Sequence, residues 1–230
     1  MKYLAPIINY LLHNKAYRKR KNDGYPGWDS VEVIEQSIRE MEAMMNKIAL
    51  PKHAKVLDMG CGAGNLSFWL ESMGFEVFGT DVASEAIQWA EAEASKRGSQ
   101  VRFSVNDATK SLPFPENSFK LVMDNHSLHC IIGKDRRNYL QNVFRLLKPG
   151  GYYLVSTMCY ERTDSDILLG FDSESRCLLR EGVALRYLGT AQSIQVEIAS
   201  AGFSILHSKA QYDEEDNGEL FVTAQKPNLH

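Results

Sequence analysis

Residues 55–65, which read KVLDMGCGAGN, decide the fold of this chain. An apolar, β-prone run ends at Asp58, and glycine then occupies every second position from Gly60 to Gly64. Residues 66–73 follow with the apolar spacing of an amphipathic helix. A glycine turn between a strand and a helix lets the backbone approach a ligand closely, because glycine has no Cβ and adopts positive φ easily. The helix N-terminus adds free N–H groups, so the stretch predicts a ligand-binding loop.

Two ligand classes compete for this loop. A dinucleotide site requires G-x-G-x-x-G, but here the third glycine position falls on Asn65 and Gly64 comes one residue early. Asp58 precedes the first glycine by two residues, where a carboxylate suits a cationic group better than a pyrophosphate. The pattern D-x-G-C-G-x-G resembles motif I of the class I S-adenosylmethionine-dependent methyltransferases, whose ligand carries an ammonium and a sulfonium group.

Composition indicates one domain with a sizeable core, because the chain has 230 residues of which 44% are hydrophobic. The net charge of −3 gives no general attraction to nucleic acid or membranes. Four scattered cysteines contain no C-x-x-C pair, so no metal site and no disulfide framework is expected. No run is long enough to span a membrane, and the basic cluster follows the apolar N-terminus where a signal peptide would have it in front. A soluble, cytoplasmic protein is the expectation.

The first 29 residues are predicted to form an N-terminal helical or lid segment that precedes a domain over residues 30–230. Apolar residues at helical spacing predict a short amphipathic helix over residues 1–12. The basic cluster after it is interpreted as a solvated face, with RNA or membrane binding as the alternative. Tyr25 and Trp28 lie in a turn-rich linker, where they either fold over a bound cofactor or anchor the segment by hydrophobic contact.

The rest of the chain alternates between strand and helix patterns. After a helix capped at residue 29 or 30, with an apolar stripe from Val31 to Ile48, strands are predicted near residues 55–58, 75–81, 101–105, 120–124 and 152–158. Helices are predicted between them, and a last one from about Thr190 contributes Val196 among others to the core. This alternation predicts an α/β fold with a doubly wound, mostly parallel sheet.

Five elements in order make the resemblance to class I methyltransferases specific. They are the glycine loop, the acid at Asp81, and the segments NDA (106–108), LPFPENSF (112–119) and LLKPGGY (146–152). Residues 30–225 resemble this domain, in a ubiquinone-biosynthesis-type group that acts mostly on small molecules. The resemblance implies a Rossmann-like, seven-stranded sheet, in which residues 203–210 and 219–225 form the sixth strand and the antiparallel last strand.

The resemblance also implies S-adenosylmethionine as cofactor and a set of residues that bind it. Asp58 and the glycines would line its methionine part, Asp81 would hold the ribose, and Asp107 with Ala108 would take the adenine edge. The expected cofactor-binding set is Tyr25, Trp28, Asp58, Gly60, Cys61, Gly62, Gly64, Asp81, Val82, Asn106, Asp107, Ala108, Asn125 and His126. For each acid, an ordinary cap or turn is the alternative.

Methyl transfer depends mainly on positioning, which supplies about 7–11 kcal/mol of barrier reduction. A general base adds roughly 3–5 kcal/mol, and His126 and His129 are the candidates because both follow the fourth strand of the domain. A structural histidine bound to a backbone carbonyl is the alternative for each. Residues 160–191 are longer than the fold requires and are predicted to form a lid-like insertion. The expected substrate-binding residues are His129, Tyr160, Arg180, Arg186 and Tyr187.

Several functions remain open from the sequence, and a methyltransferase with a small-molecule acceptor is preferred. An RNA or protein methyltransferase that uses the basic N-terminus is the second reading, although the fourth strand ends in DNHS and lacks an Asn-Pro-Pro-Tyr type motif. A non-catalytic module that binds S-adenosylmethionine is the third, and a nicotinamide dehydrogenase is the last. The sequence does not identify the acceptor, the methylated atom or the oligomeric state.

Overall fold

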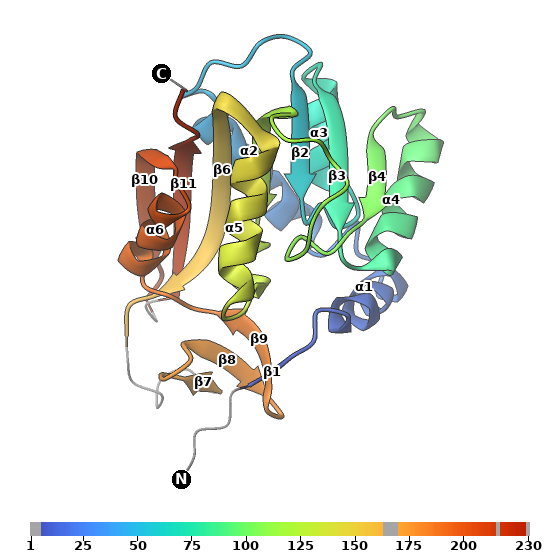
Figure 1. Ribbon diagram of the computed structural model, residues 1–230. Helices are drawn as coiled ribbons and strands as arrows, with labels where there is room; N and C mark the ends of the chain where they lie inside the picture. The colour runs from blue at the N-terminus through green and yellow to red at the C-terminus, as the bar shows by residue number, and fades with distance from the viewer. Residues whose placement is uncertain (1–5, 163–169, 215–216, 229–230) are drawn as a thin grey trace.

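The computed structural model describes residues 6–162, 170–214 and 217–228. Its main sheet has seven strands in the order β10-β11-β6-β5-β2-β3-β4 (Figure 1). β11 is antiparallel to both neighbours, and the other pairs in the sheet are parallel, as predicted. The strand bounds are β2 (Lys55–Met59), β3 (Glu76–Asp81), β4 (Arg102–Val105), β5 (Phe119–Asn125), β6 (Leu147–Tyr160), β10 (Ser204–Tyr212) and β11 (Asn217–Gln225).

Helices cover both faces of this sheet, which confirms the doubly wound architecture (Figure 1). Serine and threonine side chains cap two of them: the Ser30 hydroxyl accepts a bond from the Val33 N–H, and Thr190 does the same for Ser193. Gly98 ends a third helix in the left-handed conformation. The helices against the sheet are α2 (Val31–Met45), α3 (Asn65–Ser72), α4 (Ser84–Arg97), α5 (Asp135–Leu146) and α6 (Ala191–Ser200).

Two hydrophobic clusters hold these layers together. One packs α5 and α6 against the sheet through residues such as Tyr139 and Ile198. The other packs α2 and α3 against the opposite face through residues such as Met41 and Phe68. The parallel strands between them are buried on both sides, and their carboxyl ends are left free at one edge of the sheet.

A second, smaller sheet joins the N-terminal segment to the insertion. Its strand order is β1-β9-β8-β7, and the parallel pair of β1 with β9 matches Ile7 with Val183. Tyr10 strengthens this link, because its hydroxyl donates to Asp135 at 3.0 Å and accepts from the Ile132 N–H at 3.2 Å. The bounds are β1 (Ile7–Ile8), β7 (Phe171–Asp172), β8 (Cys177–Arg180) and β9 (Val183–Tyr187).

The N-terminal helix differs from the prediction. Its bounds are α1 (Leu12–Asn22), whereas residues 6–11, part of the expected helix, hold β1 and a turn. Residues 1–5 lie outside the described part of the chain. Ile7 and Leu11 are 61% and 62% exposed, so the apolar spacing that suggested a helix has no core to pack against. Pairing with β9 supplies backbone hydrogen bonds that decide the conformation instead.

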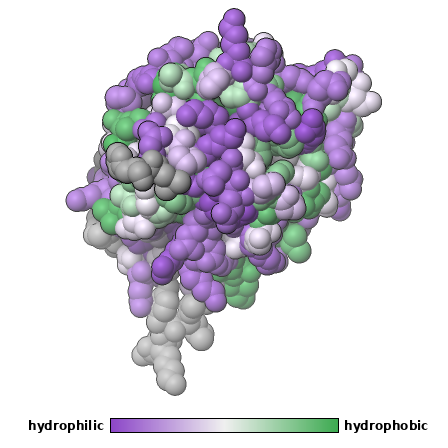
Figure 2. Space-filling model, turned by 45° about the horizontal axis from the view of Figure 1, so that its top comes forward, coloured by the Kyte–Doolittle hydropathy of each residue, from purple (hydrophilic) through white to green (hydrophobic). Residues whose placement is uncertain are grey.

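Two residues that the apolar stripes assigned to the core are exposed. Val31 is 52% exposed because it begins α2, six residues before Ser37, the first buried residue of that helix. Val196 is 57% exposed. It is two residues away from both Ile194 and Ile198, so it lies on the opposite side of α6 from the buried face that those two residues share. One face of the molecule is mostly hydrophilic, with small apolar spots (Figure 2). Across the described ranges, no helix has the length and apolar character that a membrane span needs.

Candidate functional site

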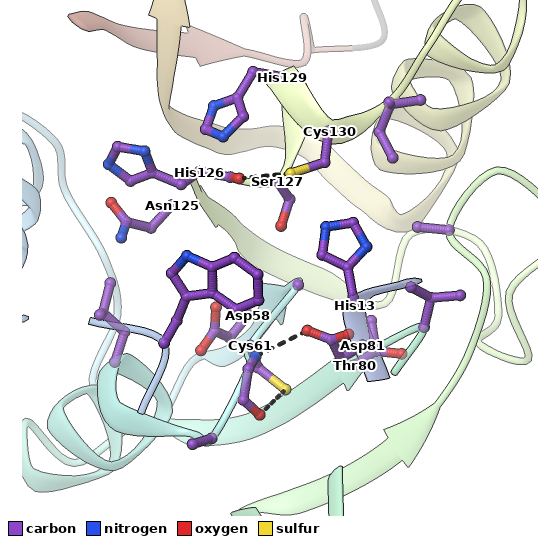
Figure 3. A pocket seen from close by; sticks show the side chains of 18 of the residues that line it. His13, Asp58, Cys61, Thr80, Asp81, Asn125, His126, Ser127, His129 and Cys130 are labelled. Atoms are coloured by element: carbon purple, nitrogen blue, oxygen red, sulfur yellow. Dashed lines mark hydrogen bonds between the residues drawn. The ribbon is translucent and has the colours of Figure 1, made fainter. Parts of the chain in front are cut away.

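A cavity of about 460 Å³ lies at the carboxyl ends of β2, β3 and β5, where ligands of doubly wound sheets bind (Figure 3). Asp58 and Asp81 lie on one side of it, and His126 and His129 lie on the other. The size falls within the range of small-molecule sites. Most of the predicted cofactor set lines this cavity, namely Trp28, Asp58, Gly60, Cys61, Gly62, Asp81, Val82, Asn106, Asp107, Ala108, Asn125 and His126.

At two positions the backbone of the glycine turn lies close to side chains from other segments of the protein. Gly60 has φ of +75°, and a Cβ there would lie 1.6 Å from the Ser127 Oγ. Gly62 has φ of +54°, and a Cβ there would lie 2.7 Å from the Tyr17 hydroxyl oxygen. Both positions therefore require glycine for conformation and for space. Gly64 is the N-cap of α3 and does not line the cavity.

Asp58 is the penultimate residue of β2, and it is buried, with 2% of the residue exposed. The hydroxyl of Ser67 donates to it at 2.6 Å. Burial raises the pKa of Asp58 to about 7, and the bond from Ser67 opposes that rise. A cationic ligand group beside this carboxyl would favour its charged form.

Asp81 links β3 to the glycine turn. Its carboxylate accepts from the Gly62 N–H at 3.0 Å and from the Ala83 N–H at 2.8 Å. Burial raises the pKa of Asp81, while these backbone N–H groups and nearby His13 act against the rise. The sequence placed this acid at the ribose of a nucleotide, and the structure places it on the cavity wall, tied to the loop that would bind the same ligand.

The NDA segment lies beyond β4 and combines binding and structural contacts. The Asn106 amide donates to Thr80 at 3.0 Å and to Ser104 at 2.9 Å. Asp107 accepts two bonds from Thr109, and its other oxygen is 2.9 Å from Lys110 Nζ. The Asp107 carboxylate thus stabilises its own turn, which is the structural role that the sequence left open as an alternative. It also lines the cavity.

The tip of β5 holds two polar side chains against the cavity. His126 has φ of +69°, a conformation that non-glycine residues adopt rarely, and its N–H donates to the Ser156 carbonyl at 2.9 Å. Such backbone strain tends to occur at functional positions. Asn125 has a buried Oδ1 that forms no hydrogen bond within the described chain. This orphaned acceptor is a polar group that a ligand N–H or O–H would satisfy.

His129 lies in the 3₁₀ turn η1 (Leu128–Cys130) and is 3% exposed. Its Nδ1 accepts from the Met158 N–H at 3.2 Å, so the proton of the neutral ring is on Nε2. Burial lowers the pKa of His129 well below its ordinary value, and the charge of Arg186 lowers it further. The geometry is that of a neutral hydrogen-bond donor.

Aromatic residues of the N-terminal segment line one side of the cavity. Trp28 packs edge to face on Tyr17 with ring centroids 4.9 Å apart, and it contacts His13 at 5.7 Å. The guanidinium of Arg186 lies 5.9 Å from the centre of the Trp28 ring. Side chains from α1, the linker and β9 therefore meet over the same cavity.

Some predicted residues lie away from the cavity. Tyr25 stacks under the Arg20 guanidinium at 4.6 Å, outside the site. Tyr160 is buried in a separate cluster with Phe171. Arg180 is exposed on β8, and Tyr187 packs on the guanidinium of Arg136. Of the expected substrate-binding residues, His129 and Arg186 line the cavity.

Sequence reasoning missed several residues that line the cavity. His13 and Tyr17 share one face of α1 at i and i+4, and that spacing was the one available signal. Tyr10, Ser37 and Cys130 gave no signal, because their approach depends on how distant segments pack. Across the described residues, no group of three or more histidine, cysteine or acidic side chains is arranged to hold a metal ion.

Comparisons with known proteins point to one family. Residues 56–151 match a family model described as a methyltransferase domain. Phosphoethanolamine N-methyltransferase 1 of Arabidopsis thaliana is 33% identical over 144 residues, 62% of this chain and 27% of that protein. Demethylmenaquinone methyltransferase of Anoxybacillus flavithermus is 29% identical over 153 residues, 65% of this chain and 62% of that protein. A solved S-adenosylmethionine-dependent methyltransferase of Methanosarcina mazei superposes with a TM-score of 0.67 at 25% identity, covering 78% of this chain and 95% of that one.

Together these comparisons support a class I S-adenosylmethionine-dependent methyltransferase, with a methyltransferase domain over residues 56–151. The chain spans about a quarter of the length of the first curated relative named above and about three fifths of the second. S-adenosylmethionine is the cofactor of this methyltransferase family, and the residues present fit it. The buried Asp58, the Asp81 carboxylate and the free Asn125 Oδ1 offer acceptors for its ammonium, hydroxyl and amino groups.

Proposed function

We propose that this chain transfers a methyl group in line from S-adenosylmethionine to a small-molecule acceptor. The observation that carries the proposal is the single cavity in which Asp58 and Asp81 lie across from His126 and His129 (Figure 3). S-adenosylmethionine supplies a methyl group on a positively charged sulfur. Two carboxylates on one wall suit that charged ligand, and the opposite wall leaves polar side chains for an acceptor.

In this proposal different residues bind the different parts of the cofactor. Asp58 binds the ammonium group of the cofactor, and Asp81 binds the ribose hydroxyls. Asp107 and the Ala108 backbone take the adenine edge, with Asn125 beside the methionine part. Holding both reactants in one geometry supplies most of the rate enhancement.

The acceptor site is proposed on the side of His129 and Arg186. Both line the cavity, whereas Tyr160, Arg180 and Tyr187 lie off it. The Nε2–H of His129 donates a hydrogen bond, and the guanidinium of Arg186 favours an anionic or aromatic group. The two curated relatives named above carry phosphoethanolamine and demethylmenaquinone in their names, which supports a small molecule rather than a polymer.

The basic N-terminus gives less support to an RNA or protein substrate. Arg18 pairs with Glu85 at 2.6 Å, and Lys19 pairs with Asp23 at 2.5 Å. These pairs neutralise part of the cluster on α1. We also propose a cytoplasmic location, since all four cysteines are unpaired and a reducing compartment suits them.

The test joins cofactor binding with acceptor turnover. Calorimetry should detect binding of S-adenosylhomocysteine and none of NAD, and Asp81→Ala should weaken that binding. A release assay for S-adenosylhomocysteine is then run with small amines, phenols and quinols, with RNA, and with a peptide pool. We expect release with a small molecule. Release with RNA or peptide alone, or binding without any release, would reject the proposal in favour of the corresponding alternative.

A further inference from the structure

A carboxylate of the last strand lies next to the imidazole of His126. Glu219 belongs to β11, and its Oε1 is 3.6 Å from the His126 Nε2, with side chains 25% and 40% exposed. Ser156 of β6 donates a short hydrogen bond to the same oxygen. The 3.6 Å separation is slightly longer than a hydrogen bond, and catalytic contacts of this kind often tighten when ligands bind.

Three adjacent strands fix this arrangement. β11 lies next to β6, and Ser156 of β6 pairs with Asn125 at the end of β5. The Ser156 carbonyl accepts from the His126 N–H, while the Ser156 hydroxyl bonds Glu219. One residue of the central strand thus holds both members of the pair. Rigid strands position such groups more accurately than loops do.

His126 lies between two hollows of the surface. It lines the main cavity, and it also lines a second hollow of about 450 Å³ with Glu219 and residues of α2. The imidazole is therefore in contact with the proposed acceptor space on one side and with open solvent on the other. This is the position that a group passing a proton from a reactant to water requires.

The neighbouring histidine is not suited to that task. The Nδ1 of His129 already accepts from the Met158 N–H, and its ring is 3% exposed. To take a proton it would have to give up this bond and carry a buried charge beside Arg186. Of the two histidines at the tip of β5, His126 is the one with a carboxylate partner.

We propose that Glu219 is a positioning residue that holds the His126 imidazole through Nε2, so that Nδ1 accepts the proton lost by the acceptor during methylation. This inference rests on the proposed function and adds that the attacking atom carries a proton, as in a hydroxyl group or a neutral amine. The acceptor lone pair forms the new bond to the methyl carbon, and the carbon–sulfur bond breaks with its electron pair left on sulfur. The proton moves to His126 and then to water.

Other charged groups face this pair and set its pH response. Glu32, Arg39 and Glu40 of α2 line the second hollow. Burial raises the pKa of Glu219, His126 and Ser156 lower it, and Glu40 and Asp124 raise it again.

The kinetic test compares His126→Asn, Glu219→Gln, the double variant and Glu76→Gln. Glu76 is a matched control, because it forms salt bridges with Lys55 and Arg102 on the far part of the sheet. We expect kcat to fall about 100-fold or more in His126→Asn and about 10-fold or more in Glu219→Gln. The double variant should resemble His126→Asn, because the two residues act as one unit. Affinity of Glu219→Gln for S-adenosylhomocysteine should change less than about two-fold.

Full additivity of the two losses, or a kcat of Glu219→Gln equal to that of Glu76→Gln, would overturn the inference.

A second measurement needs no acceptor, so it separates failure of this inference from failure of the proposed function. The Glu219 carboxyl group is followed by carbon-13 NMR as pH is varied. His126→Asn should raise the pKa of Glu219 further, because the imidazole that lowers it is gone. If no acceptor is turned over, the proposed function fails while this titration still decides whether the pair interacts. An unchanged Glu219 titration in His126→Asn would reject the pair.

Discussion

The hydroxyl group of Ser67 donates a 2.6 Å hydrogen bond to the carboxyl group of Asp58, and both side chains are buried. Burial raises the pKa of Asp58 to about 7 in spite of this bond. At neutral pH the group that is proposed to bind an ammonium ion therefore carries a proton in about half of the free protein molecules. Binding and protonation compete for the same carboxyl group, with consequences for affinity and for stability.

Cofactor binding is expected to release protons from Asp58 near neutral pH. The ammonium group favours the carboxylate, so the pKa of Asp58 falls on binding. At pH 7 about half of a proton should leave, and the number should approach zero by pH 9. Calorimetry of S-adenosylmethionine binding in buffers of different ionisation enthalpy measures this directly. Heats that do not depend on the buffer at pH 7 would contradict the prediction.

Asp58→Asn is expected to stabilise the ligand-free protein at alkaline pH. The folded pKa of Asp58 is about 7 against an ordinary value of 3.8, so the folded state binds more protons between these values. Wild-type stability therefore declines as pH rises from about 4 to 7. The amide does not ionise, so the gain over wild type should reach at most about 4 kcal/mol at pH 8 and vanish below pH 4. Urea unfolding at both pH values measures it.

The control for that experiment is Asp107→Asn. Burial raises the pKa of Asp107, but bonds from Thr109 and Lys110 outweigh this and leave the pKa lowered. Its charged form is therefore favoured by folding, and its replacement should not stabilise the protein at pH 8. Equal stabilisation by both variants would show that net charge, not the burial of Asp58, is responsible.

The main sheet was predictable because its signals are local. Alternating strand and helix periods, the cap at Ser30 and the glycine turn each specify their own segment, and parallel order follows from their alternation. The carboxyl ends of the strands then bring Asp58, Asp81 and Asn125 to one edge. Positions in the candidate site that end a strand could therefore be read from the sequence.

The rest depends on contacts between distant segments, which no local pattern encodes. The pairing of Ile7 with Val183 creates the small sheet and removes the helix expected at the N-terminus. The same packing brings Tyr17 against Gly62 and leaves Tyr160 in a separate cluster. Glu219 reaches His126 through the antiparallel last strand, and an acid in a strand pattern gives no sign of such a partner.

Gly60→Ala should be destabilising and should abolish cofactor binding, and Gly74→Ala is its matched control. Both residues have positive φ, +75° and +87°, so both variants incur left-handed strain of roughly 1–2 kcal/mol. A Cβ at Gly74 meets nothing within 4 Å, whereas at Gly60 it would lie 1.6 Å from the Ser127 Oγ. The Gly60 variant must therefore displace the tip of β5. Calorimetry and urea unfolding should separate the two, and equal losses would contradict the role of close approach.

Arg136→Leu should destabilise the fold by about 3 kcal/mol, because one buried guanidinium serves several partners. Its Nη1 donates to the carbonyls of Leu128 and Ile131, while its Nε and Nη2 donate to Glu197 of α6. Leucine removes the guanidinium partner of the Ile131 carbonyl and one of the two bonds that the Leu128 carbonyl accepts, and both groups lie at η1 or directly after it, the turn that carries His129. Turnover should therefore fall through a higher acceptor KM, with cofactor affinity nearly unchanged.

Arg137→Leu removes a charge from the adjacent, exposed position of α5 and controls for net charge. It should change unfolding free energy by less than about 0.5 kcal/mol, as surface substitutions usually do. The contrast matters because both variants carry the same charge and differ in whether the lost guanidinium was buried. If Arg136→Leu lowers the unfolding free energy no more than Arg137→Leu does, η1 must be held by its own turn and by Asp124. The Asp124 carboxylate accepts from the Ser127 and Leu128 N–H groups.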